Sequence, residues 1–93
     1  AAAVTKTIQK YEEELMDVQL KRHDILLELE DANNEVSAAE TKYNEAVGQG
    51  AKTEAARGWA QARSNRDRLK HVDEDLAERE KLLNEELAVA LGS

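Results

Sequence analysis

The chain has 93 residues, a formal net charge of −7, charged side chains at 35% of its positions and aromatic ones at 3%. Large apolar residues are too few for a compact globule, and the richness in Ala, Glu, Lys, Leu and Arg is typical of long helices. Cysteine and proline are both absent, which excludes disulfides and thiolate metal sites. The predicted fold class is therefore all-α.

A coiled-coil stripe runs through the first half of the chain. From position 8 onward, residues that are apolar except for one arginine recur at alternating spacings of three and four. The stripe consists of Ile8, Tyr11, Leu15, Val18, Arg22, Ile25, Leu29, Ala32, Val36, Ala39, Tyr43 and Ala46. This is the a/d pattern of a coiled coil, and it predicts a helix over residues 4–47.

Two glycines at mid-chain predict a turn over residues 48–50. Gly48 and Gly50 stand just past the first stripe, where glycine ends a helix without steric cost. A second helix is expected over residues 51–91, with 4–91 forming one hairpin domain and 1–3 and 92–93 as appended ends. Its weaker stripe reads Ala55, Trp59, Ala62, Arg66, Leu69, Val72 or Asp73, Leu76, Glu80, Leu83, Leu87 and Ala90.

Charge and side-chain size favour an antiparallel arrangement of the two arms. Folding at Gln49 brings the acidic stretch 27–41 beside the basic stretch 57–71, whereas a parallel dimer would stack acid on acid. The same pairing sets Trp59 against Ala39 and Tyr43 against Ala55. It also predicts four register-setting residues, with Arg22 near Asp73 and Glu80, and Arg66 near Glu28 and Glu35. The predicted fold is a long antiparallel two-helix coiled-coil hairpin. One continuous helix paired antiparallel with a second copy would satisfy the same rules.

No residue pattern in the chain indicates catalysis, a cofactor or a metal. His23 and His71 match no ligand spacing, Gly48-Gln49-Gly50 is not a phosphate-binding loop, and a two-helix rod offers its carboxylates no cleft. We therefore expect no enzyme activity. The basic stretch could neutralise phosphates, but the negative net charge argues against nucleic-acid binding. The chain has no apolar run long enough for a membrane span, and a cytoplasmic location is the default expectation.

Apolar residues outside the stripes predict an interaction surface. Met16, Leu20 and Leu27 lie on the helix face opposite the stripe, Leu26 lies at its edge, and Leu82 adds apolar area at the same end of the hairpin. Large apolar residues are normally avoided on the outside of a two-stranded rod. We expect these five residues to bind protein helices, of a second copy or of another protein. A homo-oligomer in which two hairpins form a four-helix bundle is the favoured form. The alternative is that the leucines merely lie along their own rod.

Two long helices around a short glycine-containing turn resemble several known architectures in shape. The arrangement is similar to the homology-region-one fingers of Rho effectors, which would imply a small GTPase docked on one helix face. It also looks like the N-terminal hairpins of some viral nucleocapsid proteins, which would imply self-association. The tRNA-binding arm of seryl-tRNA synthetases is similar too, but that family implies outward-facing basic residues, which this chain lacks. The sequence thus predicts a non-enzymatic protein–protein interaction or assembly module of a larger protein.

Overall fold

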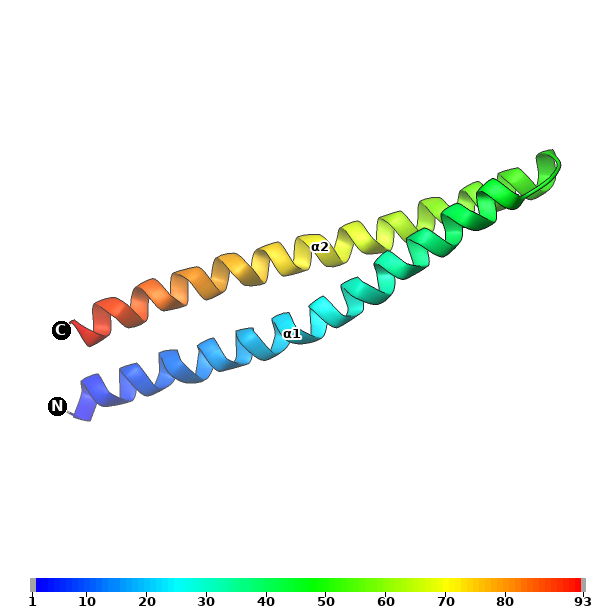
Figure 1. Ribbon diagram of the computed structural model, residues 1–93. Helices are drawn as coiled ribbons and strands as arrows, with labels where there is room; N and C mark the ends of the chain where they lie inside the picture. Colours follow the sequence, from blue (N-terminus) through cyan, green and yellow to red (C-terminus); the bar gives the residue numbers. More distant parts are fainter. Residues whose placement is uncertain (1, 93) are drawn as a thin grey trace.

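The computed structural model describes residues 2–92 and consists of two helices. Helix α1 spans Ala2–Glu45 and helix α2 spans Gln49–Leu91. They pack antiparallel along their length into a rod of 72 × 15 × 13 Å, with both chain ends at the end away from the turn (Figure 1). The predicted all-α hairpin is confirmed, and the break between the helices rules out one continuous helix.

The turn lies two residues earlier than expected, at residues 46–48. Gly48 has φ 93° and ψ 154°, a conformation open almost only to glycine. The peptide N–H of Lys52 already donates to the carbonyl oxygen of Gly48 at 3.0 Å, so Gln49 and Gly50 belong to α2. One glycine suffices to reverse the chain, which is why the second is free to be helical. Helix α1 also begins before the predicted residue 4.

The seam between the helices follows the predicted stripes. Every member of the first stripe is buried or half-buried, and so is every member of the second, including both Val72 and Asp73. The most buried side chains are Val18, Ala32, Val36, Ala55, Leu69 and Leu83, each with at most 9% of its surface exposed. The seam is therefore complete without any residue from the predicted interaction surface.

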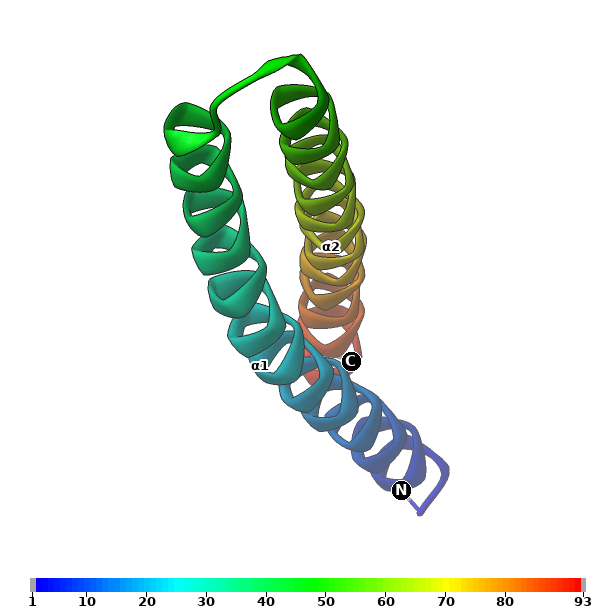
Figure 2. The ribbon, with the colours of Figure 1, turned by 90° about the vertical axis from the view of Figure 1, so that its right-hand side faces the viewer.

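The two helices wind around each other along the rod. Near the chain ends they lie apart in Figure 1 and overlap in Figure 2. Near the turn they overlap in Figure 1 and lie apart in Figure 2. A heptad repeat imposes such a supercoil, and it also gives the rod two edges. With Arg22 at an a position, the a and e positions of both helices follow one edge, here called the e edge. The d and g positions follow the other, the g edge.

Candidate interaction surface

Arg22 is held between two carboxylates of α2. Its Nε lies 3.1 Å from Asp73 Oδ1 and its Nη1 lies 3.2 Å from Glu80 Oε2. The hydrogen bond to Asp73, followed by the one to Glu80, raises the pKa of the Arg22 guanidinium above its ordinary value. A raised pKa means that this stabilisation is complete below the ordinary value and is lost only in still stronger alkali. Three of the four predicted register-setting residues are thus brought together.

The fourth, Arg66, has a different partner from the one predicted. Its Nη2 and Nε lie 3.1 Å and 3.2 Å from Oδ1 of Asp67, on its own helix. Arg66 is at an a position on the e edge, whereas Glu28 and Glu35 are at g positions. Both glutamates line a groove on the g edge together with Arg68. The prediction that Arg66 pairs with Glu28 and Glu35 is wrong, because they share a level of the rod but not an edge.

The arrangement at Arg22 recurs three heptads closer to the turn. The Tyr43 ring lies between Lys52, whose Nζ is 4.6 Å from the ring centroid, and Trp59, whose ring centroid is 5.4 Å away. Lys52 Nζ also donates to the Tyr43 carbonyl oxygen at 3.0 Å. At both sites an a residue of α1 sits between two a residues of α2 that are seven positions apart. Sequence reasoning missed Lys52, although its place seven residues before Trp59 was the signal.

Trp59 belongs to the seam, as predicted, and its ring has neighbours besides the predicted alanine. It is half-buried, with its Nε1 fully buried and without a hydrogen-bond acceptor within the described residues. Its ring is in contact with the Tyr43 ring, and the Arg63 guanidinium lies 4.5 Å from its centroid. The sequence sets Trp59 against Ala39 and Tyr43 against Ala55, and the structure adds a contact between the two rings.

The predicted apolar residues of α1 are exposed. Met16 has 64% of its surface exposed, Leu20 61% and Leu27 52%. They occupy b and f positions on the side away from α2, which we call the outer face of α1. Leu26, at an e position, is 48% exposed and lies between this face and the e edge. These side chains form an unpartnered apolar surface beside a seam that is already complete.

Leu82 does not join this surface. It is 46% exposed, but it stands at a c position of α2, next to the g edge. Going around a heptad helix the order is a, e, b, f, c, g, d, so Met16 and Leu26 lean toward the e edge and Leu82 leans toward the g edge. The five residues predicted as one surface thus divide into four on α1 and one on another face of the rod.

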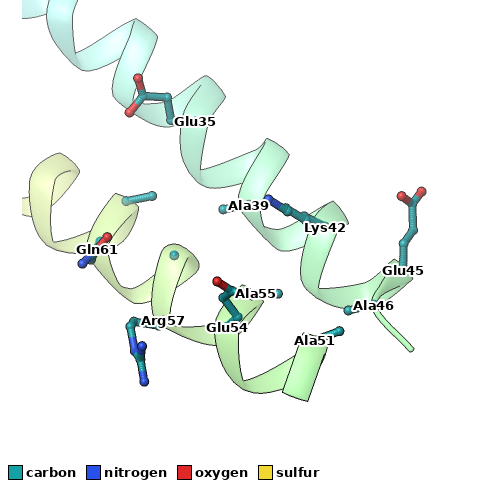
Figure 3. Close-up of a pocket in the computed structure, with 12 residues that line it drawn as sticks. Glu35, Ala39, Lys42, Glu45, Ala46, Ala51, Glu54, Ala55, Arg57 and Gln61 are labelled. Atoms are coloured by element: carbon teal, nitrogen blue, oxygen red, sulfur yellow. The ribbon is translucent and has the colours of Figure 1, made fainter. Parts of the chain in front are cut away.

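A groove of about 820 Å³ runs along the g edge beside the turn. Figure 3 shows small side chains of both helices between the two ribbons, while Arg57 and Glu45 point away. The groove is lined by Ala39, Ala46, Ala51, Ala55, Gly58 and Ala62, and by Glu35, Lys42, Glu45, Glu54, Arg57 and Gln61.

The acidic and basic stretches lie side by side, but they do not form the direct ion pairs of a zipper. Within residues 2–92, the ion pairs between the helices are those of Arg22 and one of 3.7 Å between Arg79 and Glu14. In the basic stretch, Arg63 stacks on Trp59 and Arg68 donates to Asn65 at 2.9 Å. The two stretches therefore face each other with opposite charge but without a direct ion pair among the described residues.

The described part of the chain shows neither a membrane-spanning helix nor a metal-binding cluster. Neither helix there is long and apolar enough to cross a membrane. Between residues 2 and 92, no three His, Asp or Glu side chains are placed to hold a metal ion together. Comparisons with protein families, with curated proteins and with solved structures found no match. The residues themselves define an extended helical hairpin with large apolar side chains on its surface.

Proposed function

We propose that the chain is a non-enzymatic protein–protein interaction module whose outer α1 face packs against another helix in an assembly. The observation that carries this proposal is the exposure of Met16, Leu20 and Leu27 on a rod whose own seam is complete. An amphipathic helix packing onto such a face is a common mode of recognition. The proposed binding surface is therefore Met16, Leu20, Leu26 and Leu27, with Leu82 on a separate face.

Burying the apolar side chains of this face would release enough free energy to stabilise an interface. Full burial of a leucine contributes roughly 1.5–3 kcal/mol. Leu20 and Leu27 have 61% and 52% of their surfaces still exposed, so burying the remainder would contribute about 1–2 kcal/mol each. Side chains that contribute more than about 1 kcal/mol are the minority that dominate binding. Changing both leucines should therefore remove most of the interaction.

The test compares two double variants of the chain. Leu20→Glu with Leu27→Glu places two charges on the outer face, and Asn34→Glu with Thr41→Glu places the same two charges at f positions nearer the turn. Association with a second copy is measured by light scattering, and association with another helix by titration with a leucine-containing amphipathic peptide. Circular dichroism records helix content.

We expect the leucine variant to lose association at unchanged helix content, while the control variant retains it. If both variants associate as the parent does, the outer face is not the binding surface. If the leucine variant loses its helix content, these residues belong to the core and the proposal is wrong.

Finer versions of this function stay predictions. A homo-oligomer built as a four-helix bundle requires mass that rises with concentration. The small-GTPase-binding finger is favoured by the confinement of Met16, Leu20 and Leu27 to one helix, and it requires a monomer with a nucleotide-dependent partner. A cytoplasmic location is a prediction in either case.

A further inference from the structure

The outer face of α1 carries a second alternation of threes and fours. Asp17, Leu20, Asp24, Leu27 and Asp31 follow one another at spacings of three and four, and all five side chains are exposed. This is the spacing of the inner stripe, displaced to the c and f positions. We call these five residues the outer stripe. Helix α1 thus has one stripe of coiled-coil spacing toward α2 and another toward solvent.

We propose that the outer stripe binds a basic amphipathic helix, in which leucines alternate with lysines or arginines at the same spacing. Leucines of the partner would pack on Leu20 and Leu27, and its cations would meet the aspartates. This inference rests on the proposed function and names the partner of the same face. Because alternate positions of the stripe are charged, a purely apolar helix would leave carboxylates desolvated and unpaired.

The electrostatics around the outer stripe favour a cation. Asp17 has Lys21 at 2.9 Å, but Asp24 and Asp31 have no basic side chain within 4.0 Å in the described chain. Arg22, the other basic residue of this segment except for His23, is bound to two carboxylates of α2. The formal net charge of −7 adds a negative field over the whole molecule, which speeds the approach of a basic partner.

The same charges argue against a second copy on this face. Two outer stripes in parallel register would place aspartate on aspartate in every other layer, because like positions meet in a parallel coiled coil. In antiparallel register each leucine layer would contain an aspartate from the other copy, so carboxylates would be buried against apolar side chains. A helix with basic residues in place of the aspartates avoids both costs.

The test uses three synthetic helical peptides of about three heptads. The first alternates leucine and lysine at the spacing of the outer stripe, the second replaces lysine by glutamate, and the third replaces leucine by alanine. Binding to the full chain is measured by titration calorimetry at two salt concentrations. We expect the leucine–lysine peptide to bind at least about tenfold more tightly than either of the others, and more weakly at high salt.

Variants of the chain then locate the contact. Leu20→Ala with Leu27→Ala should weaken binding of the leucine–lysine peptide by about tenfold or more. Asp24→Asn with Asp31→Asn should weaken it several-fold. The matched control, Asp75→Asn with Glu78→Gln, removes the same charge from the outside of α2 and should change affinity less than about twofold. Equal weakening by the control would mean that only net charge matters, and would overturn the inference.

The remaining outcomes separate this inference from the proposed function. Equal binding of the leucine–glutamate peptide, or self-association that depends on Leu20 and Leu27, overturns the basic partner but leaves the outer face as an interaction surface. No binding of any peptide and a constant monomer mass overturn both.

Discussion

Leu82 and Leu83 are neighbours in sequence but have opposite environments, and this difference predicts the effect of the same substitution at each. Leu83 is 3% exposed in the seam, whereas Leu82 is 46% exposed outside it. Leu83→Ala removes buried methyl groups and leaves a cavity, which costs about 2–4 kcal/mol. Leu82 has just over half of its surface buried, so Leu82→Ala should cost only about 1–1.5 kcal/mol.

These losses are large enough to measure by thermal unfolding followed by circular dichroism. For a chain of this size each kcal/mol moves the midpoint by roughly 4–8 °C. Leu83→Ala should therefore lower the midpoint by about 10–30 °C and Leu82→Ala by about 4–12 °C. The measurement is made at two protein concentrations, because association through an exposed face would make the midpoint concentration-dependent. Equal losses for the two variants would show that Leu82 is as much a part of the seam as Leu83, and would refute the heptad assignment of α2.

Four further substitutions test the turn, helix α2 and the two sites at which a residues interleave. Gly48→Ala should cost about 1–3 kcal/mol in thermal unfolding, because a φ of 93° strains any residue that has a side chain. Gly58→Ala should instead stabilise α2 by about 0.5–1 kcal/mol, since the new Cβ meets nothing within 4 Å. Arg22→Ala should lower the midpoint, and by less when both of its carboxylate partners are already replaced by amides. If the loss is the same in both backgrounds, the ion pairs do not act as a unit. Tyr43→Ala should shift the fluorescence emission of Trp59 to longer wavelength, because a neighbouring ring is lost; an unchanged spectrum would contradict the ring contact.

The seam was predictable because a heptad repeat leaves little freedom. Once the spacing of threes and fours holds from Ile8 to Ala46, one face of α1 is apolar and must be covered. The pairing of Arg22 with Asp73 and Glu80 followed from the same spacing and is present in the structure. Level along the rod and heptad position together were sufficient for these contacts.

The level along the rod does not by itself predict which side chains pair. Glu28 and Glu35 face Arg66 by residue number, but the heptad places them on the opposite edge of the rod, and Arg66 binds Asp67 instead. The contact between Tyr43 and Trp59 does not follow from level alone either, because a residues of one helix interleave with those of the other. Level and heptad position are both needed to predict such contacts.

The turn illustrates a different kind of limit. Gly48 and Gly50 are equally able to take a positive φ, and the sequence offers no reason to prefer either. The structure uses Gly48 and continues α2 through Gly50. A single reversal needs only one such residue, so local sequence places the turn to within about two residues.

The two stripes of α1 have the same spacing, but only the inner one is apolar apart from Arg22, so burial of apolar surface turns it toward α2. The charges at the a positions of α2 reinforce that choice. Asp73 and Glu80 attract the inner stripe through Arg22, at 3.1 Å and 3.2 Å. If α1 were turned about its axis, the same two carboxylates would meet the aspartates of the outer stripe, and like charges would be pressed together in a half-buried seam. Arg22 therefore does more than align the helices lengthwise. Together with the apolar inner stripe, it keeps Leu20, Leu27 and the aspartates beside them on the outside, where the basic partner we propose can reach them.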